Sequence, residues 1–267
     1  MITRILHLSD LHFGRQRPLL VETLVAQAWE LAPDLIAISG DLTQRARRRE
    51  LDAARAFLER LPRPRLLVPG NHDMPGWRLW ERFGDPWRKW RSRLGPDLEP
   101  VVETDRLLAF GINSARPGGL YRDWSRGRID PAQIERIEGL LAAREEQSLR
   151  LLIAHHPLLL TPPGAHRGLM GNAELALSRL ATAGLDLALG GHIHLGYAGV
   201  VNGIVIAHAG TGTSDRLVGE PNGCNLITAD GDLLQVAHWQ WQGDRFAPAA
   251  EHRFQRSPAG WRSEDKA

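Results

Sequence analysis

Side chains that could bind metal ions recur in this sequence directly after short apolar runs. The most conspicuous cluster is Gly70-Asn71-His72-Asp73, because the run that precedes it, Leu66-Leu67-Val68-Pro69, has the pattern of a strand. Asn71 offers a carbonyl oxygen, and His72 offers an imidazole that can ligate a metal or move a proton. Four further clusters follow strand-like runs in the same way: Asp10-Leu11-His12, Gly40-Asp41, His155-His156-Pro157 and Gly191-His192-Ile193-His194.

Together the clusters supply oxygen and nitrogen donors of the kinds that transition metals prefer. We expect two carboxylates, one amide and four imidazoles to act as ligands: Asp10, His12, Asp41, Asn71, His155, His192 and His194. This set suits two divalent ions of Mn, Fe, Co or Zn better than Ca or Mg. Side chains at i and i+2 of an extended segment share one face, so one strand end is expected to present both Asp10 and His12. The other histidines are predicted to be solvated or hydrogen-bonded residues: His7, His156, His166, His208, His238 and His252.

Alternating strand and helix patterns must position these clusters. Residues 2–8 and 34–39, with the run ending at Gly70, have strand patterns, and residues 18–31 and 45–61 between them have helical periodicity. This order predicts parallel strands whose carboxyl ends meet at one edge of a sheet, where ligands bind in open α/β folds. The sequence therefore predicts an α/β fold with a dinuclear metal site at the carboxyl ends of its strands.

The second half of the chain repeats this arrangement before its pattern changes. Three strands are predicted near further polar clusters: 107–112, 149–154 and 185–189. Asp130-Pro131 opens one helix, as N-cap and first residue, and residues 172–183 form another. The later apolar runs suggest a second sheet built largely of adjacent strands: 203–207, 224–228 and 233–241. We expect a single domain over residues 1–256 and a loose tail over residues 257–267.

Composition limits the class of protein. The chain has 267 residues, of which 43% are hydrophobic and 24% charged, which is enough apolar material for the core of an α/β protein. The formal charge of +2 gives no argument for nucleic acid, and the basic run at residues 45–49 is interpreted as a solvated helix start. Cys224 is the only cysteine, so an intrachain disulfide is impossible. Without a signal-peptide layout or a membrane-spanning run, the expected location is cytoplasmic.

Two segments between the predicted strands could select a substrate. Residues 75–98 contain four tryptophans at helical spacing: Trp77, Trp80, Trp87 and Trp90. This spacing indicates either a helix packed on the core or a cap over the site. Residues 118–128 form a Gly- and Arg-rich loop. Four polar residues in or just before this loop are expected to contact the substrate: Asn113, Arg116, Arg122 and Arg126.

The five clusters, in this order, resemble the pattern of the calcineurin-like metallophosphoesterases. The motifs of that family are D-x-H, G-D, G-N-H-[DE], H-x-P and G-H-x-H, and they stand here as Asp10-Leu11-His12, Gly40-Asp41, Gly70-Asn71-His72-Asp73, His155-His156-Pro157 and Gly191-His192-Ile193-His194. The resemblance extends from about residue 2 to residue 215. It implies a four-layer sandwich of two mixed β-sheets flanked by helices, and a metal-dependent phosphoric ester hydrolase.

The resemblance also implies a role for each ligand. The ligands implied for the first ion are Asp10, His12, Asp41 and His194. Those implied for the second ion are Asp41, Asn71, His155 and His192, so that Asp41 bridges the two. His72 resembles the non-ligand histidine of the family, which protonates the leaving oxygen or steadies the phosphate. Catalysis is therefore expected to depend on His72 and Asp41, with a water activated by the two ions as nucleophile.

Departures from the family pattern bear on the substrate. Gln44 stands where purple acid phosphatases carry a tyrosine, and His72 stands where the UDP-sugar pyrophosphatases of the lipid A pathway carry an arginine. The motif forms are closest to those of cyclic nucleotide and glycerol phosphodiesterases, although Leu158 replaces the second proline of the H-H-P-P form that many of them have. We therefore expect a small phosphodiester, such as a 3′,5′-cyclic nucleotide or a glycerophosphodiester.

Three other functions are compatible with the same motifs: a broad-specificity phosphomonoesterase, a DNA exonuclease of the repair type and a non-catalytic scaffold. The nuclease type usually carries further domains and a DNA-binding surface, so a nucleic-acid partner is not expected here. A scaffold would have lost ligand residues, and none is missing. A homo-oligomer is compatible with every one of these functions.

Overall fold

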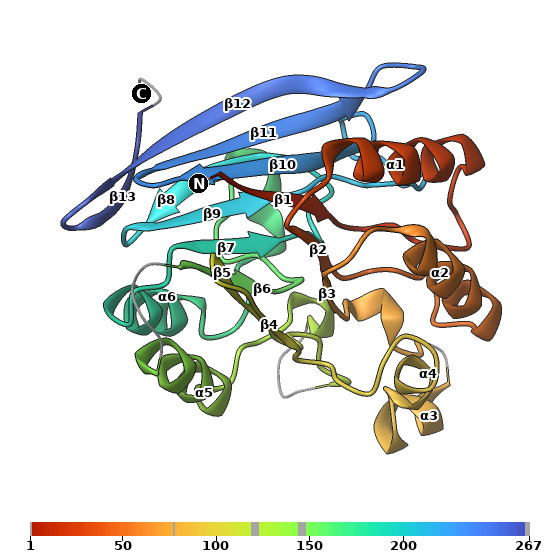
Figure 1. The fold of residues 1–267 in the computed structure, drawn as a ribbon. Coiled ribbons are helices and arrows are strands. Elements are labelled where there is room, and N and C mark those ends of the chain that lie inside the picture. The colour runs from red at the N-terminus through yellow and green to blue at the C-terminus, as the bar shows by residue number, and fades with distance from the viewer. Residues whose placement is uncertain (1, 77, 119–122, 144–147, 265–267) are drawn as a thin grey trace.

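Two mixed β-sheets pack face to face in the computed structural model, which describes residues 2–76, 78–118, 123–143 and 148–264 (Figure 1). Helices cover the outer faces of both sheets. Two of them lie over the first sheet: α1 (Pro18–Leu31) and α2 (Arg48–Arg60). Two others lie over the second sheet: α5 (Pro131–Ala142) and α6 (Ala173–Thr182). The four-layer sandwich implied by the family resemblance is confirmed.

The first sheet has the order β13-β12-β11-β10-β1-β2-β3. Its three parallel strands are β1 (Thr3–Leu8), β2 (Leu35–Ser39) and β3 (Arg65–Val68). Its four remaining strands are antiparallel: β10 (Gly223–Asp230), β11 (Leu233–Trp241), β12 (Phe246–Ser257) and β13 (Gly260–Ser263). The prediction that the C-terminal runs build the second sheet is therefore wrong for residues 223–241. Alternating polarity identifies them as strands but does not say which sheet edge they join, and β10 pairs with β1.

The second sheet has the order β4-β5-β6-β7-β9-β8. Its parallel strands are β5 (Leu107–Gly111), β6 (Leu149–Ile153), β7 (Leu187–Gly190) and β9 (Ile204–His208). Two short antiparallel strands close its edges: β4 (Val101–Glu103) and β8 (Tyr197–Val201). The parallel strands are buried throughout, which explains why they read as continuous apolar runs.

Apolar side chains fill the spaces between the layers. Ile5 of the first sheet and Leu151 of the second belong to the cluster between the sheets, and neither is accessible to solvent. Leu24 of α1 packs against the outer face of the first sheet, and Ile134 of α5 packs against the outer face of the second. Removing one such side chain typically costs about 2–5 kcal/mol, so the strand ends that carry the clusters are firmly placed.

The tryptophan-rich segment does not form the long helix that its periodicity predicts. It contains two short helices, α3 (Leu79–Gly84) and α4 (Arg88–Arg91). Asp85-Pro86-Trp87 separates them, because proline disfavours a helical conformation of the residue before it. Trp87 and Trp90 are buried with ring centroids 6.4 Å apart, whereas Trp80 is 69% exposed. These two buried rings therefore pack on the core. Trp77 lies outside the described residues.

The predicted loose tail is wrong as far as Ser263. Strand β12 ends at Ser257, and β13 returns along it so that Arg256 lies opposite Trp261. Trp261 is buried in the cluster between the sheets, and its indole N–H donates to Asp186 Oδ1 at 3.0 Å. Small and polar residues around Pro258-Ala259-Gly260 suggested a tail, but they form the turn of a hairpin. Among the described residues, no helix has both the length and the apolar character to cross a membrane.

Candidate metal centre

The carboxyl ends of five parallel strands bring the predicted ligands together. Asp10 and Asp41 follow β1 and β2, and Asn71 begins the short helix η1 (Asn71–Asp73) after β3. His155 follows β6, and His192 and His194 follow β7. The two sheets are joined directly, because His155 Nδ1 lies 2.7 Å from the carbonyl oxygen of Ser39. The cluster therefore forms where the ends of both sheets face each other.

Left-handed backbone conformations place most of these side chains. Five of the seven have positive φ angles: Asp10 (51°), His12 (47°), Asp41 (51°), His192 (69°) and His194 (64°). The extended presentation predicted for Asp10 and His12 is therefore wrong. Each left-handed residue turns the chain back along the sheet edge, and the neighbouring turns bond to each other, with His12 N–H donating to the Asp41 carbonyl at 2.9 Å. Such strain costs roughly 1–3 kcal/mol per residue and persists where surrounding contacts impose it.

One group of donors surrounds Asp10. His194 Nε2 lies 3.2 Å and His12 Nε2 3.6 Å from Asp10 Oδ1, and the two ring nitrogens are 3.4 Å apart. All three side chains are buried. Asp10 Oδ2 accepts hydrogen bonds from Ser9 Oγ at 2.7 Å and from the backbone N–H of His192 at 3.0 Å. Asp10 Oδ1 has no hydrogen-bond donor among the described residues. A buried carboxylate oxygen facing two imidazole nitrogens is a set of atoms that can hold a metal ion.

A second group of donors surrounds Asn71. Its Oδ1 atom lies 3.2 Å from His155 Nε2 and 3.1 Å from His192 Nδ1. His155 Nε2 also lies 3.3 Å from Asp41 Oδ2, and the same carboxylate oxygen is 3.8 Å from His12 Nε2 of the first group. Asp41 Oδ2 therefore lies between the two groups.

His156 is a further candidate that sequence reasoning set aside. It is buried, and its ring lies close enough to His155 and His192 for the three to offer one ligand atom each within 4.8 Å of one another. Its Nδ1 atom lies 2.8 Å from Ser114 Oγ, and its Nε2 atom has no hydrogen-bond partner in the described part of the chain. The hydrogen bond that was predicted for His156 is present, but the residue also borders the second group.

Burial and neighbouring charges shift the pKa values of the side chains in the cluster. Burial opposes ionisation of Asp10, but His194 and His12 beside it outweigh burial and hold the pKa of Asp10 well below its usual value. Burial lowers the pKa of His155, but the Asp41 carboxylate outweighs burial and raises that pKa to about 9. Burial and the positive charge of His155 together lower the pKa of His192 to about 3. The two carboxylates thus stay ionised and favour positive charge between them.

Asp73 and Gly70 hold the Asp41 loop in place. The Asp73 carboxylate accepts hydrogen bonds from the N–H groups of Gly70 (3.0 Å), Leu42 (3.1 Å) and Thr43 (2.8 Å). Gly70 lies so close to Asp41 that a Cβ atom would stand 2.2 Å from Asp41 Oδ1. Sequence reasoning gave neither residue a role, although both belong to the G-N-H-D motif that it identified.

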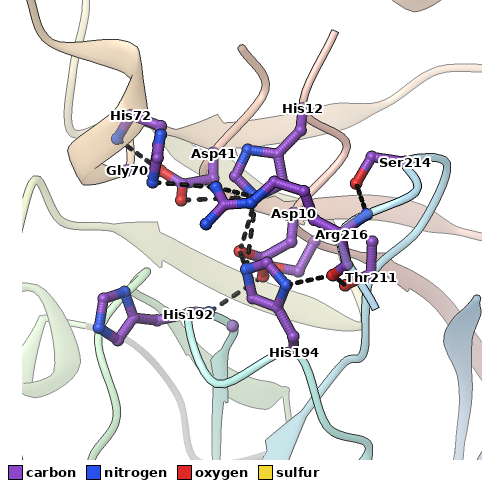
Figure 2. Close-up of polar contacts among 12 residues, drawn as sticks. Asp10, His12, Asp41, Gly70, His72, His192, His194, Thr211, Ser214 and Arg216 are labelled. Carbon is purple, nitrogen blue, oxygen red and sulfur yellow. Dashed lines mark hydrogen bonds and ion pairs between the residues drawn. The ribbon is translucent and has the colours of Figure 1, made fainter. Parts of the chain in front are cut away.

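Arg216 reaches the cluster, although sequence reasoning did not single it out. Figure 2 shows its side chain reaching toward His72 and His12, and Arg216 NH1 lies 3.0 Å from His72 Nε2 and 3.4 Å from His12 Nε2. Its carbonyl oxygen lies 2.7 Å from His194 Nδ1, which turns His194 Nε2 toward Asp10. The feature that could have identified Arg216 is its position after a strand: it lies in the loop that follows β9, and β9 is parallel to β7 and ends at the same sheet edge.

A cavity of about 370 Å³ opens beside His72. Its walls are formed by Gln44, Arg45, Asn71, His72, Met74, Gly76, Arg82 and Ser125. His72 is half-buried, and its Nδ1 atom lies 2.8 Å from the Gln44 carbonyl oxygen. The cavity therefore reaches the side of the cluster that Asn71 and His72 form.

Three of the residues predicted to contact a substrate do not line this cavity: Asn113, Arg116 and Arg126. Arg116 is bonded to Asp130 at 2.7 Å and to the Asn113 carbonyl at 2.5 Å, and the Asn113 N–H donates to Glu99. Arg126 donates to the Leu169 carbonyl. Arg122 lies outside the described residues. These arginines were singled out because they are near Gly-rich sequence, but the arginines at the cavity wall are Arg45, which precedes α2, and Arg82 of α3.

Comparison with known proteins identifies the family. A model of the family described as calcineurin-like phosphoesterase matches residues 3–196. The chain belongs to this family, which confirms the assignment made from the motifs.

Individual relatives agree with this placement. A protein of Synechococcus sp. described as a probable cyclic nucleotide phosphodiesterase is 31% identical over 130 residues, which are 48% of this chain and 44% of that protein. The chain thus spans less than half the length of that relative. The purple acid phosphatase PPD1 from yellow lupin seeds superposes with a TM-score of 0.70 at 16% identity, covering 94% of this chain and 53% of that one. A dimetal phosphatase from Danio rerio gives 0.67 at 13% identity, covering 96% and 99%. These two structures share the fold.

The contact between Gly70 and Asp41 yields a test of the cluster. Gly70→Ala should lower metal content and destabilise the protein by about 1–3 kcal/mol, because the new methyl group must displace the Asp41 carboxylate. The backbone of Gly70 has φ −104°, so the effect is steric and not conformational. Gly84→Ala is the matched control, because a Cβ there meets nothing within 4 Å. Elemental analysis and urea unfolding of both variants decide the matter, and equal behaviour of the two would contradict this placement of Asp41.

Proposed function

We propose that the protein hydrolyses a small phosphodiester, such as a 3′,5′-cyclic nucleotide or a glycerophosphodiester, with two divalent transition-metal ions. The observation that carries the proposal is the position of Asp41 Oδ2, which lies 3.3 Å from His155 Nε2 and 3.8 Å from His12 Nε2. A carboxylate between two groups of donors would suit a pair of divalent ions, as in two-metal hydrolases. The Synechococcus relative, described as a probable cyclic nucleotide phosphodiesterase, supports the choice of a diester.

The donor set favours particular metals and a particular division of ligands. Imidazole, carboxylate and amide donors suit Mn, Fe, Co or Zn. The ligands proposed for one ion are Asp10, His12, Asp41 and His194, and those proposed for the other are Asp41, Asn71, His155 and His192. The Oδ1 atom of Asp10, which has no hydrogen-bond donor in the described part of the chain, supports this assignment, because a buried carboxylate oxygen needs a donor or a cation.

The ions and the protein contribute different parts of the reaction. When bound, the two ions lower the pKa of a water molecule and neutralise charge on the phosphate oxygens. The protein orients the ligands, since the carbonyl oxygens of Ser39 and Arg216 fix the rings of His155 and His194. Burial of the ligands keeps bulk water from screening the charges that develop on the phosphate.

His72 and Arg216 face the space that the phosphate would occupy. The Gln44 carbonyl accepts from His72 Nδ1–H, so Nε2 of the neutral ring accepts from Arg216 NH1 at 3.0 Å. His72 can give a proton to a leaving oxygen only from Nε2, and for that Arg216 must first leave this nitrogen. In the proposed mechanism the guanidinium turns to a non-bridging phosphate oxygen, and the freed His72 Nε2 takes a proton from solvent. His72 then gives this proton to the leaving oxygen as the bond to phosphorus breaks.

A substrate panel tests the proposed function. Mn-loaded protein should hydrolyse bis-p-nitrophenyl phosphate and a 3′,5′-cyclic nucleotide faster than p-nitrophenyl phosphate or single-stranded DNA. Asp41→Asn keeps the shape of the side chain but removes its charge, so it should lower occupancy of both metal sites and nearly abolish turnover. Faster turnover of the monoester would point to a phosphomonoesterase, and cleavage of DNA alone would point to a nuclease. Full metal content without any turnover in the wild type would point to a scaffold.

His72→Ala should separate chemistry from metal binding. The variant should keep its metal content while turnover of a diester with a poor leaving group falls by about 10²–10⁴-fold, the usual contribution of a general acid. The loss should be smaller for bis-p-nitrophenyl phosphate, because p-nitrophenolate needs little protonation. Equal losses with both substrates would show that His72 positions the phosphate instead.

Arg216→Ala should lower kcat/KM by about 10- to 100-fold, the effect of losing one hydrogen bond to a charged group. The backbone carbonyl that orients His194 remains, so metal content should be unchanged. Arg15→Ala is the control, because Arg15 forms an exposed ion pair with the neighbouring Asp215 at 2.8 Å. Steady-state kinetics of both variants decide the matter. A loss in Arg216→Ala no greater than in the control would exclude Arg216 from phosphate binding.

A further inference from the structure

A second cavity adjoins the one beside His72. It has a volume of about 550 Å³, and Arg45 and Gly76 belong to the walls of both cavities. Five cationic side chains and one carboxylate line it: Arg45, Arg47, Arg48, Arg78, Lys89 and Glu81. Both volumes lie within the range of about 300–1,000 Å³ that is usual for small-molecule sites. One ligand could therefore extend from His72 past Arg45 into the second cavity.

The acidic groups nearby do not balance this charge. Glu81 is buried and pairs with Lys89 at 2.5 Å and with Arg78 at 2.9 Å. The carboxylate of Glu50 lies 3.8 Å from the Arg47 guanidinium. The side chains of Arg45 and Arg48 have no acidic partner within the described part of the chain. The cavity wall therefore carries uncompensated positive charge.

The positive charge comes from the side chains, and the backbone N–H groups at the N-terminus of α2 add little to it. Glu50 accepts from the Arg45 N–H at 2.8 Å and from the Arg47 N–H at 3.3 Å, so these two backbone donors are already occupied. Guanidinium groups present planar pairs of N–H donors that match phosphate oxygens. The basic run at residues 45–49, interpreted from sequence as a solvated helix start, thus contributes Arg45, Arg47 and Arg48 to a cavity wall, whereas Arg49 does not line it.

We propose that this second cavity is an anion subsite that binds a second phosphate group of the substrate. The inference rests on the proposed function, because it assumes that the reacting phosphodiester lies beside His72. It narrows the substrate class to phosphodiesters that carry an additional phosphate on the same small molecule. A 3′,5′-cyclic mononucleotide has one phosphate and would leave the subsite empty.

Binding and kinetics of two matched pairs of compounds test the subsite. The dissociation constants of thymidine 5′-phosphate and thymidine 3′,5′-bisphosphate are measured by calorimetry on the Mn-loaded protein. In parallel, KM is measured for the p-nitrophenyl esters of thymidine 5′-phosphate with and without a 3′-phosphate. The bisphosphate member of each pair should have a dissociation constant or KM about fivefold lower, which is the upper end of the range for a partly exposed charge pair.

Two arginine variants make the test specific. In Arg48→Ala the ratio of the two dissociation constants, monophosphate over bisphosphate, should fall to near unity. The control Arg49→Ala, from the same basic run, should keep the wild-type ratio. Equal binding of both members of a pair by the wild type, or an unchanged ratio in Arg48→Ala, would overturn the subsite. Because calorimetry needs no turnover, a protein that binds the bisphosphate preferentially but hydrolyses neither ester would overturn the proposed function and not the subsite.

Discussion

The fixed position of the Asp41 carboxylate is the constraint on which the rest of the centre depends. One oxygen, Oδ1, accepts a hydrogen bond from the backbone N–H of His72 at 2.8 Å. This leaves Oδ2 between the imidazoles of His155 and His12. The side chain is buried, and the absence of a Cβ at Gly70 gives it room. If the carboxylate could rotate, Oδ2 would face one group of donors or the other. Because the hydrogen bond holds Oδ1, Oδ2 stays between both groups.

The sandwich supplies this position by facing two sheet edges. The first sheet contributes Asp10, Asp41 and Asn71, and the second contributes the three imidazoles that follow β6 and β7. Neither edge alone holds a complete set. The contact between His155 and the Ser39 carbonyl at 2.7 Å fixes the distance between the edges, and the left-handed residues keep the loops close to it. Strain in these loops is tolerated because the apolar layers behind them are closely packed.

The sequence was sufficient to predict what local pattern determines. The helix over residues 18–31 has the predicted bounds, and the strands before each cluster lie within a residue or two of their predicted positions. Pairing partners were not predictable in this way, so residues 223–241 were expected in the wrong sheet, and the hairpin that buries Trp261 was missed. The helix predicted in the tryptophan-rich segment was too long, because the spacing of the tryptophans was given more weight than Gly84 and Pro86.

The same distinction applies to the site. The predicted ligands stand in short motifs, and the structure brings these residues together. Arg216 belongs to no motif and reaches His72 only because β9 is parallel to β7. The arginines of 113–128 were expected at the substrate because they are near Gly-rich sequence, but Arg45 and Arg82 line the cavity beside His72. Which arginine faces a cavity depends on tertiary packing, and local sequence does not determine that packing.

Anomalous X-ray diffraction from crystals of the Mn-loaded protein tests the central claim most directly. The account predicts two anomalous peaks about 3.5–4 Å apart, as in other two-metal sites, with the Asp41 carboxylate between them. One peak should contact Asp10 and the other Asn71. A single peak at full Mn occupancy, or two peaks that Asp41 does not bridge, would contradict it.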